Sequence, residues 1–549
     1  MSEGPSPGAR RTELDDVAAA EVLPSEEVTA PRPRAGRLAR STAFFAFATG
    51  LSRIAGLVRE IVAASFFGAK GQMSAFTIAF QLPNLVRSLF ADAAIQAAFV
   101  PVFTEHLERG ENREAFRLGS TLIYLVALIL GLLTALFILL APLLMPLFAP
   151  GFGDERDQLM VALAQALFPI LLLLGVSGMV VGVLNSYDRF AAFAIAPFFW
   201  NLAIIAVLVG FAPLVPEQDE IHLYAVGVVV GTVVQLAICA ADIRNTPFRL
   251  LRVFDWRSPD VRRVLLLMLP VTISLGLINV NLLVNSFFGS LVSDRGPAAI
   301  DKAFRIYMLP QGIFSVAVAT VLFPTLSRFA ARAEYDDLRA TMANGMRQIV
   351  LLLMPATAAI LVLSEPMVRL VYQRGEFGVG QTELVATALF WFAFSLPFNG
   401  LFLLLTRTFF SLQRPWVPSA IAAMNLAVTA LFSGIFYGPF GVGGIVAATA
   451  IATAASVAAQ SEILRRQLGR LELGRLAWTT ARVTLASALL AVASYATWRL
   501  LDELLGRGLA GQIASLGVAL ALGAVVYGAV ITLLRIPEAS QIWSLARRR

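Results

Sequence analysis

The sequence has few charged residues for its length. Of its 549 residues, 14% are charged and 58% are hydrophobic, and the mean hydropathy is +0.75. A soluble domain carries roughly 25% charged residues, whereas apolar runs of about 18 or more residues recur here to the C-terminus. Helices satisfy their own backbone hydrogen bonds in lipid, and the alternation typical of a membrane β-barrel is absent. The composition predicts an all-α polytopic membrane protein.

The sequence also lacks the motifs of several enzyme classes. It contains no P-loop, HExxH or GxSxG sequence, so no pattern indicates a nucleotide site, a metal site or an activated nucleophile. The single cysteine, Cys239, excludes an internal disulfide. The net charge of +7 comes largely from arginines in short loops, which indicates orientation in a membrane rather than nucleic-acid binding. We expect a transporter without covalent chemistry, catalytic residues, bound metal or a nucleic-acid partner.

The apolar runs predict about fourteen transmembrane helices. Residues 1–36 are rich in proline, glutamate, serine and arginine, which predicts a disordered cytoplasmic tail. Several predicted spans exceed the roughly 20 residues that crossing a bilayer needs, so we expect tilts or kinks. The spans are 39–66, 72–104, 118–148, 158–185, 191–213, 222–243, 261–291, 298–328, 345–373, 382–410, 416–437, 441–464, 477–500 and 512–534.

The loops between these spans alternate in composition. The arginine-rich loops lie near 109–117, 189, 244–263, 328–347, 414 and 465–475. The arginine-poor loops lie near 70, 151–158, 215–222, 293–296, 372–383 and 437–444. Basic loops face the cytoplasm, so we expect the arginine-rich loops and both termini to be cytoplasmic.

An internal repeat divides the chain. Residues 65–68 (SFFG) recur at 286–289, and Asn201-Leu202-Ala203 recurs at 425–427, at offsets of 221 and 224 residues. The repeat predicts two pseudo-symmetric six-helix lobes in parallel orientation, with the substrate site between them. We expect an N-lobe at 37–250, a C-lobe at 251–470, and two further helices with a cytoplasmic C-terminus at 471–549.

Beyond residue 50, the first two predicted spans contain five charged residues. They are Arg53, Arg59, Glu60, Arg87 and Asp92. A charge at the centre of a membrane helix costs about 2.5–3.5 kcal/mol and normally faces a partner or a water-filled cavity. A polar stripe of Ser74, Thr77, Gln81, Asn84, Ser88, Asp92 and Gln96 follows helical spacing. These residues predict the wall of a wet cavity; snorkelling arginines and a polar helix–helix seam are the structural alternatives.

The eighth span adds another intramembrane arginine. Asp301 and Arg305 are spaced to form an i, i+4 pair, and Pro310 beyond them weakens the helix. Asp301 and Lys302 are expected near the outer end, with no special role. The arginines outnumber the carboxylates, and guanidinium groups suit carboxylate or phosphate ligands. The sequence therefore favours an anionic substrate.

Other polar residues have less specific interpretations. Asn281, Asn285, Asn425 and Thr429 either hydrogen-bond between helices or coordinate a monovalent cation, and both readings stay open. His106 and His222 lie near span ends and are interpreted as ordinary surface residues.

The first two spans carry a specific motif. SRIAGLVREIVAASFFGA at 52–69 and AFTIAFQLPNLVRSLFADAAIQAAFVPVF at 75–103 resemble the signature of the MurJ/MviN lipid II flippases. The resemblance continues through APGF at 149–152, the segment 303–328 and RGEF at 374–377. This family belongs to the multidrug/oligosaccharidyl-lipid/polysaccharide exporter superfamily.

The resemblance implies a function and a site. It implies that lipid II is flipped from the cytoplasmic to the outer leaflet of the bacterial cytoplasmic (inner) membrane, with membrane lipids and cell-wall synthesis enzymes as further candidate partners. The expected substrate-binding residues are Arg53, Arg59, Arg87, Arg305, Asn84 and Gln81, with Glu60 and Asp92 as cavity acids. The last two helices are expected to form a groove for the lipid tail. No cofactor is expected, and coupling to the membrane potential or to a monovalent cation is left open.

This sequence departs from the family pattern at two positions. Ser74 replaces the usual aspartate of a TDAF motif, and Thr429 stands where the sodium site of some relatives has a carboxylate. Both departures put ion coupling at these positions in doubt. The alternative function is a MATE-like cation-coupled exporter of drugs, or an exporter of another polyprenyl-diphosphate lipid.

Overall fold

A computed structural model describes residues 35–90, 93–469 and 472–538, without the side chains at 35–46, 86–97, 269–279 and 473. Within these ranges all regular structure is helical, which confirms the all-α prediction. The tail predicted at 1–36 lies almost entirely outside the described residues. The lobe boundaries proposed from the repeat stay predictions.

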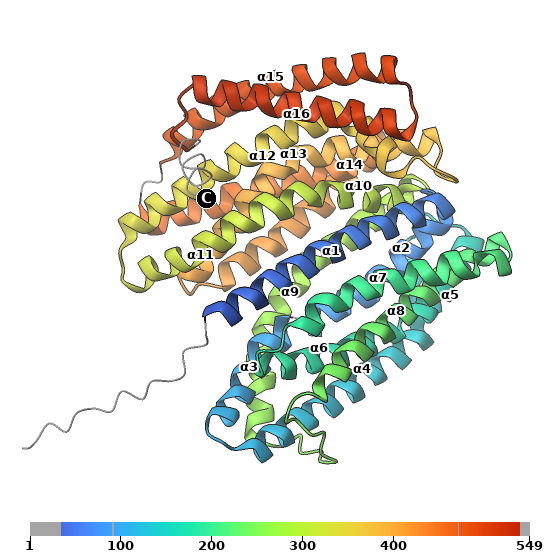
Figure 1. Ribbon diagram of the computed structural model, residues 1–549, viewed down its shortest axis with the longest axis vertical. Helices are drawn as coiled ribbons and strands as arrows, with labels where there is room; N and C mark the ends of the chain where they lie inside the picture. Colours follow the sequence, from blue (N-terminus) through green and yellow to red (C-terminus); the bar gives the residue numbers. More distant parts are fainter. Residues whose placement is uncertain (1–34, 91–92, 470–471, 539–549) are drawn as a thin grey trace, which may run out of the picture.

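The first part of the chain forms a group of helices, coloured blue to green in Figure 1. Its elements are α1 (Ala35–Phe67), α2 (Gly71–Phe90), α3 (Ala93–Glu108), α4 (Asn112–Phe148), α5 (Asp154–Leu167), α6 (Pro169–Ser186), α7 (Ala191–Phe211), η1 (Ala212–Leu214), η2 (Glu217–Asp219) and α8 (Glu220–Ile243). Gly68 ends α1 with a φ of +60°, because glycine adopts the left-handed conformation that terminates a helix at little cost. The turn that follows leads into α2, which packs mainly against α5 and α9, whereas α1 packs mainly against α7.

The second part forms a group coloured yellow to orange in Figure 1. Its elements are α10 (Gly296–Pro310), the π-helical segment η3 (Gln311–Ser315), α11 (Val316–Ala331), α12 (Tyr335–Tyr372), α13 (Val379–Ser411) and α14 (Trp416–Leu468). The weakening expected at Pro310 is therefore a π-helical segment directly after it. The helix α14 folds back at Gly441, whose φ is +56°, so its two halves lie side by side. This break matches the arginine-poor loop predicted at 437–444.

The helix α9 (Pro259–Val292) joins the two groups. Near its start Asp260 contacts His106 of α3, at 3.2 Å between Oδ2 and Nε2. Near its end the Asn281 side chain donates a hydrogen bond of 2.8 Å to Asn425 of α14. The start of α9 is therefore held by the first group, whereas its later part also contacts the second.

The described helices suit a membrane. Ten helical segments in the described ranges are long and apolar enough to cross a bilayer, with α14 counted once although it reverses at Gly441. The protein is therefore a multi-pass membrane protein. The prediction of fourteen spans is not confirmed by this count and stays a prediction.

The last helices, α15 (Leu473–Leu505) and α16 (Leu509–Leu533), form a hairpin that packs against α12 (Figure 1). Arg369 of α12 forms a buried ion pair with Asp502 of α15. At the other end Arg347 of α12 lies 3.0 Å from Glu472, between Nη1 and Oε2. Ion pairs at both ends thus fix the hairpin to the second group.

We expect Arg369→Met to destabilise the protein by about 3 kcal/mol, because it leaves Asp502 buried without its main partner. Thermal or chemical unfolding in detergent measures this loss. The matched control is Arg499→Met, since the Arg499 side chain on α15 is 66% exposed and exposed pairs contribute about 0–1 kcal/mol. Equal shifts for the two variants would show that the buried pair does not hold the hairpin.

Candidate functional site

Charged side chains from α1 and α10 meet inside the bundle. We call Arg59, Glu60, Asp301, Lys302 and Arg305 the charged cluster. Glu60 is buried and forms an ion pair with Arg59 beside it and with Arg305 across the two groups, the latter at 3.0 Å between Oε1 and Nη1. Arg305 Nε also donates to Asp301 Oδ2 at 2.8 Å, which confirms the predicted i, i+4 pair. One carboxylate oxygen thus holds one arginine from each helix group.

The cluster has an aromatic wall and little free space. The Arg59 guanidinium lies over the Trp200 ring of α7, 4.6 Å from the ring centroid. Arg59, Glu60, Asp301 and Arg305 line a cavity of about 30 Å³ together with Met73, Phe76, Thr77, Phe80, Gln81, Trp200, Tyr224 and Val228. Such a volume holds about two water molecules. In this closed conformation, the wet cavity predicted from the sequence is a small space filled by ion pairs.

The other predicted binding residues are placed differently. Arg53 is exposed. It lies next to Gly312 of η3, since a Cβ built on that glycine would be 3.6 Å from the Arg53 Nη1 atom. Gln81 accepts a hydrogen bond of 2.8 Å from Ser286 of α9. Asn84 is half-buried on α2. The side chain of Arg87 and the whole of Asp92 lie outside the described residues, so their roles stay predictions.

Lys302 was not predicted as a site residue. It was expected near the outer end without a special role, but it is fully buried next to the cluster carboxylates. Its Nζ lies 5.1 Å from the centroid of the Tyr372 ring on α12. Lys302 does lie near one end, in the second turn of α10, but its burial was not predicted; the first turns of α10 are covered by other helices. The sequence did contain one indication of this position: Lys302 and Arg305 are spaced i, i+3, which places them on the same face of the helix.

Two glycine turns close the arginine-poor end above the cluster. Residues 65–70, the end of α1 and the turn after it, meet residues 374–381, the turn before α13 and its first residues. We call this the glycine contact. Gly68 and Gly375 both have positive φ, of +60° and +53°. A Cβ on Gly375 would overlap the carbonyl oxygen of Ser65. Only glycine fits this backbone-to-backbone approach.

Hydrogen bonds and an ion pair support the glycine contact. The Glu376 N–H donates to the Ser65 carbonyl at 3.0 Å, and the Glu376 carboxylate pairs with Lys70. Nearby, the Ala298 N–H of α10 donates to the Ser74 hydroxyl of α2 at 3.1 Å. Arg59 lies eight residues before the end of α1, about 12 Å below this contact. The charged cluster therefore lies within the bundle, under a closed end.

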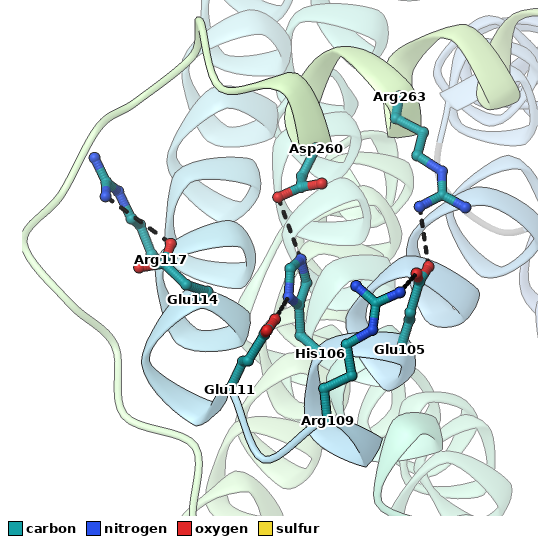
Figure 2. A network of polar contacts seen from close by, with 8 residues as sticks. All are labelled: Glu105, His106, Arg109, Glu111, Glu114, Arg117, Asp260 and Arg263. Atoms are coloured by element: carbon teal, nitrogen blue, oxygen red, sulfur yellow. Dashed lines mark hydrogen bonds and ion pairs between the residues drawn. The ribbon is translucent and has the colours of Figure 1, made fainter.

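A second network lies at the arginine-rich end (Figure 2). The two ring nitrogens of His106 lie 2.7 Å from Glu111 and 3.2 Å from Asp260. The His106 side chain is only 12% exposed, so its interpretation as an ordinary surface residue was wrong. Beside it, the hydrogen bond from Arg263 and the charge of Arg109 hold the pKa of Glu105 below its ordinary value. The favourable contribution of Glu105 is therefore complete at neutral pH and is lost only as the pH falls through the lowered pKa.

The asparagines of the second group bond to other helices. Asn425 accepts from Asn281 and donates to Ser456 at 3.0 Å. Thr449 donates to Asn285 at 3.3 Å. Among the described residues no three His, Cys, Asp or Glu side chains gather as metal ligands. A cation role for these amides stays a prediction.

Comparisons with known proteins agree on one family. Residues 63–521 match the family described as "Lipid II flippase MurJ". A protein named probable lipid II flippase MurJ from Rhizobium meliloti (strain 1021) is 31% identical over 450 residues, 81% of this chain and 84% of that protein. One of the same name from Vibrio cholerae is 27% identical over 515 residues, 91% and 96% of the two chains.

Solved structures agree on the fold. A structure titled "Lipid II flippase MurJ, inward closed conformation" aligns with a TM-score of 0.75 at 21% identity, over 90% of this chain and 99% of that one. An inward-facing MATE family transporter of the MOP superfamily aligns at 0.63 and 13% identity, over 78% and 95%. The resemblance found in the motif of the first two spans is thus confirmed. The chain belongs to the lipid II flippase MurJ family.

Proposed function

We propose that the protein moves lipid II, a disaccharide-pentapeptide linked to undecaprenyl diphosphate, from the cytoplasmic to the outer leaflet. The observation that carries this proposal is that Arg59 and Arg305, from opposite helix groups, meet at one buried carboxylate. Guanidinium groups bind phosphate oxygens in bidentate geometry. The names of the family and of its relatives support the same substrate.

Transport would follow from separation of α1 and α10. Arg59 belongs to the first group and Arg305 to the second, so parting the groups breaks the Arg305–Glu60 pair and frees donors for a diphosphate. The cavity of about 30 Å³ at the charged cluster is too small for a headgroup, and the glycine contact closes the end above it. We infer that this conformation is one stage of alternating access, in which the headgroup binds from the arginine-rich end and leaves when the glycine contact opens. No covalent bond changes.

The arginine-rich loops suggest the orientation. Placed in the cytoplasm by the positive-inside rule, they put the glycine contact at the outer face of the bacterial cytoplasmic (inner) membrane. An inside-negative potential then favours outward movement of an anion by about 2.3 kcal/mol per charge per 100 mV. The membrane potential is therefore a plausible driving force, and a monovalent cation is the other candidate.

Further partners follow from the same proposal. The lipid tail would stay in the bilayer alongside the α15–α16 hairpin, in contact with membrane lipids. Cell-wall synthesis enzymes are candidate partners because they use the product at the outer face. No cofactor and no nucleic acid takes part in this scheme.

Loss of Arg305 tests the function. In a bacterium whose own flippase is depleted, we expect Arg305→Ala to fail to support growth and to lower lipid II at the outer face by about tenfold or more, because hydrogen bonds to charged groups contribute about 1.5–3 kcal/mol. A reagent that modifies only outward-facing lipid II measures the effect. Arg295→Ala is the matched control, since Arg295 is exposed at the start of α10. Normal growth with Arg305→Ala, at wild-type protein levels, would contradict the proposal.

A MATE-like exporter of drugs or other organic cations is the alternative, because MATE structures share the fold. The charged cluster argues against this alternative. Among the described residues it has three cationic and two anionic side chains, and this surplus of positive charge repels a cationic substrate. Energy-dependent efflux of a cationic dye that requires Arg305 would favour this alternative.

A further inference from the structure

Lys302 is a buried cation without a hydrogen-bond partner. Its exposed fraction is 0%, and its Nζ makes no hydrogen bond to any described residue. An ammonium group carries three N–H donors, and burying such a charge without compensation is unfavourable. Its Nζ lies 5.1 Å from the centroid of the Tyr372 ring, a face that attracts a cation but accepts no conventional hydrogen bond. The Tyr372 hydroxyl donates instead to the Lys302 backbone carbonyl, at 3.3 Å.

The charges of the cluster leave Lys302 as the surplus cation. Glu60 is paired with Arg59 and Arg305, and Asp301 is paired with Arg305. Lys302 lies close enough to both carboxylates to interact electrostatically. No carboxylate of a described residue, however, comes within ion-pairing distance of its Nζ. The carboxylates are thus taken by the arginines, and the unbalanced positive charge is carried by Lys302, whose Nζ makes no hydrogen bond to a described residue.

The sequence adds an independent observation. Of the 43 lysine and arginine residues, only Lys70 and Lys302 are lysines. A lysine differs from arginine in being a compact charge on a flexible four-carbon stem. Such a side chain reaches different positions from one backbone site, whereas packing against Tyr372 alone would be served by an uncharged side chain such as methionine.

We propose that Lys302 is a further substrate-binding residue, which leaves the Tyr372 ring and binds an anionic oxygen of the headgroup when α1 and α10 separate. This role rests on the proposed function. It joins Lys302 to Arg59 and Arg305 as a third cation on the same ligand. Its unpaired state in the closed conformation keeps its donors available.

Stability and binding should change in opposite directions in Lys302→Met. With full-length protein in lipid nanodiscs, we expect lipid II affinity to fall about tenfold or more, because one hydrogen-bonded charge is lost. We expect the unfolding temperature of the lipid-free protein to rise, because a buried unpaired charge is removed. Arg295→Met is the control and should change neither. A purely structural lysine would give the reverse result, with a lower unfolding temperature and unchanged affinity, and would overturn the proposal.

The scarcity of lysine allows a direct observation. In Lys70→Arg protein grown with ¹³C-labelled lysine, Lys302 gives the sole lysine signals by NMR. We expect these signals to shift on addition of lipid II. A shift also with undecaprenyl diphosphate identifies the phosphate as the partner, and a shift with lipid II alone identifies a peptide carboxylate; both support the proposal. Unshifted signals in protein that binds lipid II would overturn the role of Lys302, whereas absence of lipid II binding to the wild type would overturn the proposed function itself.

Discussion

Gly375→Ala is expected to abolish support of growth in flippase-depleted cells, although residue 375 touches neither the charged cluster nor any proposed ligand. Alanine at a φ of +53° costs roughly 1–2 kcal/mol, and its Cβ would overlap the Ser65 carbonyl. That carbonyl accepts the 3.0 Å hydrogen bond from Glu376, which must then lengthen or break. A total penalty of about 3 kcal/mol lowers the closed population about a hundredfold relative to the open one. The cycle would then stall with this end open.

Labelling measures the predicted opening. Met73 lines the small cavity and is buried in the closed conformation, so a cysteine introduced as Met73→Cys reports access from outside to a membrane-impermeant thiol reagent. We expect labelling in the Gly375→Ala background and little without it. Gly380→Ala is the matched control, because no atom lies within 4 Å of its added Cβ. Normal growth and no labelling with Gly375→Ala would show that the closed end tolerates a side chain at residue 375.

The sequence predicted the helices and the two sets of loops, but not the segments that close the bundle. The apolar runs predicted helices in lipid, and the structure is helical in the described ranges. The division into arginine-rich and arginine-poor loops is consistent with the contacts, since Arg117 pairs with Asp255 within one set and Lys70 with Glu376 within the other. In the sequence, residues 65–69 (SFFGA) contribute to the internal repeat and to the family resemblance, but nothing there indicates that they close the bundle. The contact of this segment with RGEF at 374–377 is visible only in the structure. It is made between backbone atoms, and the types of the side chains do not indicate such a contact.

It was harder to predict which face of each membrane helix points into the bundle. In a soluble helix polar residues identify the exposed face, but a helix that is apolar on all sides gives no such reference. The sequence therefore predicted that Arg59 and Arg305 face inward, but not that both would bind Glu60. It gave no reason to place Trp200 or Tyr372 beside them. The burial of Lys302 was missed for the same cause.

Glu60→Gln is expected to increase apparent lipid II affinity about tenfold or more while abolishing growth. The buried Glu60 carboxylate holds Arg59 and Arg305 in the closed conformation, and therefore competes with a phosphate for the same donors. Glutamine has nearly the same shape but no charge, so the competition ends. Removing one partner from a buried ion pair costs about 3–5 kcal/mol, and this cost falls on the closed conformation. The variant should bind the headgroup and fail to release it.

Binding to nanodisc-embedded protein and the growth assay together check this result. The matched control is Glu383→Gln, because Glu383 is an exposed glutamate on α13 and should leave affinity and growth unchanged. Weaker binding by Glu60→Gln would instead mean that Glu60 contacts the substrate through a group that needs its charge, for example an ammonium of the peptide.

The double variant Glu60→Gln with Arg305→Gln separates charge balance from ligand binding. Each change alone removes one partner from a buried charge and unbalances the cluster, whereas the pair removes one charge of each sign. Residues in direct contact are energetically coupled by about 0.5–3 kcal/mol, so we expect the double variant to unfold at a higher temperature than Glu60→Gln. Its lipid II affinity should nevertheless fall below that of the wild type, because a guanidinium that binds the diphosphate is missing. Recovery of stability together with affinity would show that Arg305 serves only to neutralise Glu60.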